Sequence, residues 1–154
     1  MIDSFVLFSV QEAAAATIAG LKATAVAGNC YVLNATPENV TVDGAEVLNI
    51  NGETSTAMVR TIAEAAKGEY TLIYSNGDVL KLGLHAIERM LQIAEDSGAV
   101  MCYADRYQER KGEIVKAPVI DYQQGSLRDD FDFGSVILIK TAALKQAVSE
   151  VTGD

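Results

Sequence analysis

Short, continuous apolar runs alternate with longer segments of helical period along the first two thirds of this chain. The runs fall at residues 5–8, 30–33, 46–50, 70–74 and 100–103, and a last one at 135–140 follows a polar stretch. Continuous apolar runs of this length are typical of strands that are buried on both faces. The pattern therefore predicts short core strands rather than strands with one face in solvent.

Helices are predicted in the segments between these strands. Gly28 is the C-terminal stop expected for the first helix, and Thr54 or Ser55 is the N-terminal cap expected for the second. The four predicted helices cover residues 12–27, 55–68, 82–96 and 141–148, and the apolar stripe of the third is expected to consist of Leu84, Ile87, Leu91 and Ala94. Strands that alternate with helices predict an α/β fold with a mostly parallel sheet and right-handed crossovers.

The alternation breaks after Asp105. Residues 106–134 are polar and rich in turns, and a small hairpin is predicted over 109–115, turning at Lys111-Gly112. The pattern then returns to one strand and one helix, so the polar stretch interrupts a single domain rather than ending it.

Composition bounds the class of protein. The chain has 154 residues, 49% hydrophobic and 21% charged, which suits one globular domain. The net charge of −9 argues against binding to nucleic acid or to an anionic membrane surface. The apolar runs are too short to span a membrane, and the N-terminus lacks the basic segment of a signal peptide. A cytoplasmic protein with no transmembrane segment is therefore predicted.

The sequence lacks the motifs of several common kinds of site. The chain has no GxGxxG after its first strand, no GxxxxGK[ST] and no GxSxG, which excludes dinucleotide, P-loop and hydrolase-elbow sites. A phosphoacceptor receiver domain needs an acidic pair after the first strand, where residues 9–12 read Ser-Val-Gln-Glu. Cys30 and Cys102 lie in apolar runs and are expected to be buried thiols, although a disulfide is possible in principle. The single histidine, His85, is expected to be a structural residue.

Two predicted strands end on acidic residues. Residues 75–78 (Ser-Asn-Gly-Asp) follow one strand and Asp105 follows another. In open α/β sheets ligands bind at the carboxyl ends of the strands. The Asn76 and Asp78 oxygens could hold a divalent cation that bridges a diphosphate. The same four residues are also a strong turn signal, and both interpretations remain open.

The segment 126–134 is a second candidate. Three aspartates and Arg128 alternate there with Phe131 and Phe133, directly before a buried strand. Arg128 could bind a phosphate or a carboxylate, and the aspartates could bind a metal or sugar hydroxyls. Alternatively, this is a solvated loop that the two phenylalanines anchor to the core.

Together these pieces resemble a family 2 glycosyltransferase of the GT-A fold, the nucleotide-diphospho-sugar transferase class. Residues 66–74 (AKGEYTLIY) resemble a helix end and strand of that family, and 75–84 lie where it places a DxD turn. The strand at 100–105 (VMCYAD) and the segment SLRDDFDFGSVILIKTAAL at 126–144 also resemble family segments. The resemblance covers residues 60–148 well and 1–50 in outline. It implies a three-layer α/β/α, Rossmann-like GT-A domain over residues 1–154.

The resemblance also implies a site. A nucleotide-sugar donor would bind with Mg²⁺ or Mn²⁺ held by Asp78 and Asn76, and the acceptor would be an unidentified glycan or lipid-linked glycan. The donor-binding residues implied are Ser9, Glu12, Asn76, Asp78, Asp105, Arg128, Asp130 and Asp132.

This sequence departs from the family pattern at several points. Asn34-Ala35 replaces the acid expected after the second strand, and Asn76 replaces one carboxylate of the DxD turn, which should weaken cation binding. The family's general base is expected beyond the end of this chain, which would then be a shortened and inactive transferase. Two hypotheses follow: a glycosyltransferase domain, or a catalytically inactive GT-A module that binds a partner or scaffolds a larger protein.

Overall fold

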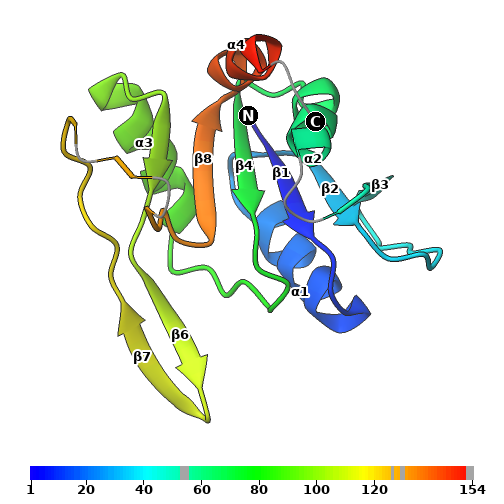
Figure 1. Ribbon diagram of the computed structural model, residues 1–154. Helices are drawn as coiled ribbons and strands as arrows, with labels where there is room; N and C mark the ends of the chain where they lie inside the picture. The colour runs from blue at the N-terminus through cyan, green and yellow to red at the C-terminus, as the bar shows by residue number, and fades with distance from the viewer. Residues whose placement is uncertain (53–55, 126, 129–130, 152–154) are drawn as a thin grey trace.

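The computed structural model describes residues 1–52, 56–125, 127–128 and 131–151. Six strands of these residues form one sheet in the order β3-β2-β1-β4-β8-β5 (Figure 1). Strands β1 to β4 pair in parallel, while β8 is antiparallel to both β4 and β5. The strands are β1 (Ile2–Leu7), β2 (Ala27–Asn34), β3 (Glu46–Asn49), β4 (Tyr70–Tyr74), β5 (Met101–Tyr103) and β8 (Val136–Lys140). The mostly parallel sheet predicted from the sequence is confirmed.

Helices cover both faces of this sheet. Successive residues of β1 show the division, because Val6 packs in one buried cluster and Phe5 in the other. The first cluster includes residues of α1 and α3, and the second includes residues of α2 and α4. The predicted three-layer α/β/α arrangement is therefore confirmed. The helices are α1 (Gln11–Lys22), α2 (Thr56–Ala65), α3 (Ala86–Ser97) and α4 (Thr141–Glu150). In the described ranges, no helix is long and apolar enough to cross a membrane.

A two-stranded hairpin extends away from the main sheet (Figure 1). It consists of β6 (Arg106–Arg110) and β7 (Glu113–Ala117), paired antiparallel. Lys111 and Gly112 form its turn, with φ of 52° and 80°. Positive φ at both central residues is the geometry of a two-residue hairpin turn. The predicted turn is confirmed, and both strands are longer than predicted.

The first helix is shorter than predicted. It ends at Lys22, and Ala27 and Gly28 are already part of β2. Gly28 is therefore not a helix stop. A Cβ at this position would lie 2.5 Å from Oδ1 of Asp3, so the absence of a side chain is what lets β2 approach β1 here. The predicted helix is too long because it follows the alanine-rich pattern, and the close approach of two strands does not change that pattern.

The third helix starts later than predicted, at Ala86 rather than Leu82. His85 directly precedes it with a φ of 52°, a left-handed conformation that is incompatible with helix continuation. Leu84 is 86% exposed and does not belong to the apolar stripe, whose buried members are Ile87, Met90 and Ala94. The caps expected at Thr54 or Ser55 lie outside the described residues.

The two cysteines are free thiols. Cys30 is buried in β2, and Cys102 is half-buried in β5. The expectation of unpaired core cysteines is confirmed, and burial raises the pKa of both thiols. A raised pKa keeps a thiol protonated and poorly reactive near neutral pH.

A buried carboxylate joins the starts of three strands. Asp3 of β1 is 1% exposed. Its Oδ1 accepts hydrogen bonds from the backbone N–H (2.8 Å) and the side-chain amide (3.2 Å) of Asn29 in β2. Its Oδ2 accepts from the backbone N–H groups of Lys67 and Gly68, both at 2.8 Å, directly before β4. Burial alone would raise the pKa of Asp3, but these hydrogen bonds stabilise the charged form and leave the pKa below its ordinary value of 3.8.

Replacing Asp3 with asparagine should strongly destabilise the fold. An amide offers one acceptor oxygen and places its own N–H groups against the backbone N–H groups, so we expect a loss of about 2–4 kcal/mol in unfolding free energy. Urea unfolding of Asp3→Asn at pH 7 measures the loss. Asp43→Asn, on an exposed loop, is the matched control and should change little.

The lowered pKa of Asp3 also makes the stability of the fold depend on pH. A carboxyl group with a depressed pKa in the folded state stabilises the fold above its unfolded pKa and loses this contribution as pH falls through the folded value. The wild type should therefore lose part of its stability below pH 3.8. The gap in stability between wild type and Asp3→Asn should narrow in the same range. A gap that stays constant down to pH 2, within roughly 0.5 kcal/mol, would contradict the assignment.

Candidate functional site

The predicted site residues follow or precede neighbouring strands at one edge of the sheet. Ser9 follows β1, Asp78 follows β4 and Asp105 follows β5, all at carboxyl ends. Asp132 precedes β8, whose antiparallel direction brings its start to this same edge. β1, β4, β8 and β5 are consecutive in the sheet, so at about 4.8 Å per strand these positions span roughly 15 Å. The fold therefore places these four residues on one edge, which the sequence pattern indicated for Asp78 and Asp105.

The loop after β1 contacts the turn after β4. The Ser9 hydroxyl donates a hydrogen bond to the carbonyl of Gly77. A Cβ at Gly77 would overlap the Ser9 side chain, so a glycine is required for this contact. The backbone N–H of Ser75 in turn donates a 3.0 Å hydrogen bond to the carbonyl of Ser135, directly before β8. Three neighbouring strand ends are thus connected directly.

The turn at 75–78 has the geometry of an Asx turn. Oδ1 of Asn76 accepts a hydrogen bond from the backbone N–H of Asp78 at 3.1 Å. The Tyr74 hydroxyl donates to the carbonyl of Asp78 at 2.9 Å. Burial, with the charge of Asp78 as a second cause, raises the pKa of Tyr74 and keeps this hydroxyl a donor. The turn interpretation is confirmed, and the Asp78 side chain is exposed above it.

A cation at this turn would need ligands beyond Asp78 and Asn76. Within the described ranges, no three His, Cys, Asp or Glu side chains are close enough together to hold a metal ion. Mg²⁺ often binds through one or two carboxylates and takes its remaining ligands from substrate phosphates and water, and Asp78 suits that mode. The Asn76 oxygen is already an acceptor in the turn. Cation binding by these two residues stays a prediction.

Asp105, which follows β5, and Asp132, which precedes β8, each accept a hydrogen bond from the backbone of a nearby loop. Oδ1 of Asp105 accepts from the backbone N–H of Val119 at 2.8 Å. Oδ1 of Asp132 accepts from the backbone N–H of Gly134 at 2.7 Å, and its Oδ2 lies 3.4 Å from Nη2 of Arg106. Both aspartates therefore have structural contacts as well as exposed surface.

Arg106 is a site residue that the sequence analysis missed. Its Nε and Nη1 are buried, and no described residue accepts a hydrogen bond from either atom. Among the described residues, its ion-pair partner is Asp132; this pair is long, and the aspartate side chain is largely exposed to solvent. A guanidinium so incompletely paired adds positive charge to this part of the edge. Its position directly after Asp105, at a strand end, was the available signal in the sequence.

Aromatic side chains anchor the loop before β8. The ring centroids of Phe131 and Phe133 lie 6.0 and 5.3 Å from that of Tyr103, at the end of β5, and 4.7 Å from each other. The two phenylalanines therefore anchor this loop to half-buried Tyr103 of β5, and neither belongs to the two buried core clusters to which the sequence analysis expected them to attach. Arg128 is exposed, and its carbonyl accepts from the backbone N–H of Phe131 at 3.0 Å. Asp130 lies outside the described residues, so its role stays a prediction.

The remaining predicted positions lie toward β2. Glu12 is exposed in the first turn of α1, three residues after Ser9. Asn34, at the position where the resemblance expects an acid, is buried at the end of β2. Its amide donates to Glu38 and Asn49 and accepts from the N–H and the hydroxyl of Thr36. These four hydrogen bonds occupy both ends of the amide, so Asn34 organises the loop rather than offering a free group to a nucleoside.

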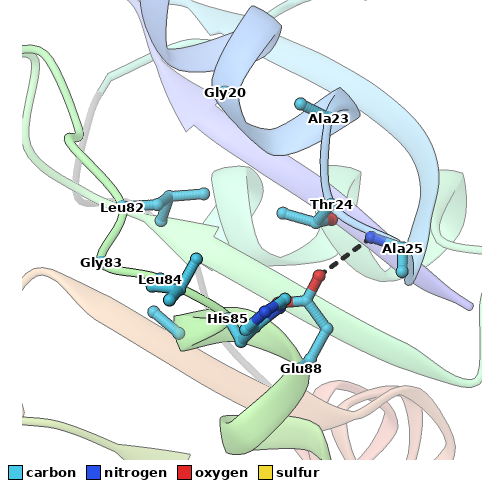
Figure 2. Close-up of a pocket in the computed structure, with 10 residues that line it drawn as sticks. Gly20, Ala23, Thr24, Ala25, Leu82, Gly83, Leu84, His85 and Glu88 are labelled. Atoms are coloured by element: carbon cyan, nitrogen blue, oxygen red, sulfur yellow. Dashed lines mark hydrogen bonds between the residues drawn. The ribbon is translucent and has the colours of Figure 1, made fainter.

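A cavity of about 390 Å³ lies elsewhere, between the C-terminal end of α1 and residues 82–88 (Figure 2). Glu88 accepts a hydrogen bond from the backbone N–H of Ala25 at 2.9 Å, and this bond lowers the pKa of Glu88. His85 also lines the cavity. A helix of 12 residues is about 18 Å long, which separates this cavity from Ser9 at the other end of α1. The cavity is therefore distinct from the strand-end site.

Comparisons with known proteins agree with this fold. A 2-C-methyl-D-erythritol 4-phosphate cytidylyltransferase (IspD) from Francisella tularensis has a TM-score of 0.55 and 13% identity, over 99% of this chain and 83% of that one. The enzyme of the same name from Thermus thermophilus has a TM-score of 0.53 and 16% identity, over 97% and 79%. No protein-family model and no curated protein matches the sequence.

These likenesses establish the fold class. The chain has a Rossmann-like α/β fold of the same kind as these two cytidylyltransferase structures. At identities of 13% and 16% the likeness concerns the fold alone. Membership in glycosyltransferase family 2 and the DxD-like role of residues 76–78 stay predictions.

The contact between Ser9 and Gly77 can be tested by substitution. Gly77→Ala should cost about 1–3 kcal/mol of unfolding free energy, because the new methyl group overlaps Ser9 and forces the two loops apart. Thermal or urea unfolding measures the loss. Gly20→Ala is the control: nothing lies within 4 Å of a Cβ there, and alanine in a helix should be neutral or stabilising by up to about 1 kcal/mol.

A second substitution tests the cause. Ser9→Gly in the Gly77→Ala background removes the Cβ that the methyl group meets, so part of the lost stability should return. A double variant no more stable than Gly77→Ala alone would show that the loss arises elsewhere.

Proposed function

We propose that this chain is a glycosyltransferase-type domain that uses a nucleoside-diphosphate sugar as donor. One observation carries the proposal: four consecutive strands deliver Ser9, Asp78, Asp132 and Asp105 to a single sheet edge. Ligands of open α/β sheets bind at this edge. The two structures of similar fold are named cytidylyltransferases, and a nucleotide-using transferase is the kind of activity that this likeness supports.

Each residue has a role in this proposal. Asp78, with the Asn76 turn beside it, would hold a Mg²⁺ or Mn²⁺ ion, which would supply positive charge to the donor diphosphate. Asp105, Arg128 and Asp132 border the sugar, while Ser9 and Glu12 border the nucleotide; the prediction for Asp130 concerns a residue outside the described ranges. Charge stabilisation of the leaving diphosphate is the largest contribution such a site can make to the rate.

The reaction is a displacement at the sugar carbon C1. The oxygen of an acceptor hydroxyl forms a new bond to C1, and the bond from C1 to the diphosphate oxygen breaks. The electron pair of that bond leaves with the nucleoside diphosphate, and the hydroxyl proton passes to a base. The acceptor is a glycan or a lipid-linked glycan.

The second candidate function is a GT-A module that binds a partner without catalysis. Asn34 favours it, because its amide is engaged in four hydrogen bonds within its own loop where the family resemblance expects an acid. Asn76 adds to this, since an amide already used in a turn is a weaker cation ligand than a carboxylate.

Calorimetric titration with UDP- and GDP-sugars in the presence of Mn²⁺ tests donor binding. We expect binding that depends on the cation and that Asp78→Ala weakens by about tenfold or more, which corresponds to one lost charge-assisted contact. Asp96→Ala, an exposed acid on α3, is the control and should leave the affinity unchanged.

The two candidate functions give different results. Donor binding together with measurable sugar transfer or donor hydrolysis supports the transferase. Donor binding without turnover is expected of the binding module and equally of a transferase whose general base lies outside residues 1–154, so turnover decides between the two candidates only when it is observed. The absence of any nucleotide-sugar binding, or binding that Asp78→Ala leaves untouched, would reject the donor site itself.

A further inference from the structure

The β6–β7 hairpin has the opposite charge from the rest of the chain. Residues 106–117 contain four basic side chains and two acidic ones, whereas the whole chain has a net charge of −9. The basic residues are Arg106, Arg110, Lys111 and Lys116, and the acidic ones are Glu109 and Glu113. A local concentration of positive charge in an acidic protein attracts anionic groups to that place.

The hairpin also exposes large apolar side chains. Tyr107 is 70% exposed and Ile114 is 76% exposed, although both lie within paired strands. An isolated two-stranded hairpin is marginally stable in water, so exposed apolar groups on it are a cost without a binding partner. An exposed tyrosine ring beside basic groups offers both a stacking surface and a charge partner.

Pairing within the hairpin brings these groups to one face. Tyr107 is directly opposite Lys116, and Glu109 is opposite Ile114. Side chains alternate between the two faces of a strand, so these four residues share a face, and Arg106, Gln108 and Arg110 lie on the other. We call the first the Tyr107–Lys116 face. It carries one basic residue, Lys116, and one acidic residue, Glu109, while the other basic residues of the hairpin lie on the opposite face or in the turn.

The Tyr107–Lys116 face lies near the candidate site. Arg106 begins the hairpin directly after Asp105, and its side chain contacts Asp132. Nζ of Lys81, in the segment that follows the Asp78 turn, lies 3.8 Å from Oε2 of Glu109. The Tyr107–Lys116 face is therefore connected to the strand-end segment, and the hairpin projects from the edge that carries the site (Figure 1). A molecule bound on this face would lie next to the donor.

We infer that the Tyr107–Lys116 face binds the acceptor, and that this acceptor is a saccharide carrying an anionic group, a carboxylate or a phosphate. The inference rests on the proposed function. Tyr107 stacks against a sugar ring, and Lys116 pairs with the anionic substituent. Glu109 is paired with Lys81, which leaves Lys116 as the cation of this face.

NMR titration of the ¹⁵N-labelled chain with trigalacturonate, a carboxylated trisaccharide, tests this. Maltotriose, which is neutral, is the comparison ligand. We expect chemical-shift changes confined to residues 106–117 and their contacts with trigalacturonate, with affinity that falls as NaCl rises from about 50 to 500 mM, because salt screens exposed charges. Maltotriose should bind at least roughly fivefold more weakly.

Variants identify the residues. Lys116→Glu should weaken trigalacturonate binding about tenfold and leave maltotriose binding unchanged, since it reverses a charge that only the anionic ligand uses. Tyr107→Ala should weaken binding of both. Lys145→Glu, an exposed position on α4, is the matched control and should change neither.

Four results would overturn the inference: equal binding of the two trisaccharides, full affinity in Lys116→Glu, shift changes centred away from the hairpin, or no binding. The competing occupant of the hairpin is a second copy of this chain. Sedimentation would detect it as a dimer that Lys116→Glu dissociates, and that result would also overturn the inference. Failure of the donor titration with intact trisaccharide binding rejects the proposed function and the acceptor role, and leaves a saccharide-binding hairpin. Donor binding without trisaccharide binding rejects the hairpin inference alone.

Discussion

The buried carboxylate of Asp3 is the interaction on which the central sheet depends. It accepts four hydrogen bonds from the segments that begin β2 and β4, while Asp3 itself begins β1. An unpaired buried charge would be very unfavourable, so the carboxylate is stable only when all three segments are in place. Gly28 and Gly68 leave room for it. This makes the three strands one cooperative unit at their starts.

The candidate site lies at the other ends of the same strands. A parallel sheet fixed at one edge delivers its carboxyl ends together at the opposite edge, and there Ser9 contacts the turn at Gly77. β8 extends this arrangement by running antiparallel, which adds Asp132 from a segment far along the chain. The hairpin continues from the last of these strand ends. The buried Asp3 carboxylate thus lies at one edge of the sheet, and the exposed candidate-site residues Asp78, Asp105 and Asp132 lie at the other.

Much of the fold could be predicted because buried strands and amphipathic helices leave clear patterns. The apolar runs located every strand of the main sheet, with boundaries off by a few residues. The errors at the end of α1 and the start of α3 have a common cause. Gly28 serves a close approach between strands and His85 adopts a left-handed backbone, and neither property affects hydrophobic periodicity. The turn residues at Lys111-Gly112 were predictable because their chemistry is local.

The sequence by itself determined the α/β class and the edge at which Asp78 and Asp105 lie, because both follow from local pattern and strand order. Only the tertiary structure decided which groups meet: Asp3 with Asn29 and Gly68, Ser9 with Gly77, and Arg106 with Asp132. These pairs are separated by 26 to 68 residues. Contacts at such separations depend on sheet order and on the space that a missing side chain leaves. Neither can be predicted from the residues next to one position in the sequence.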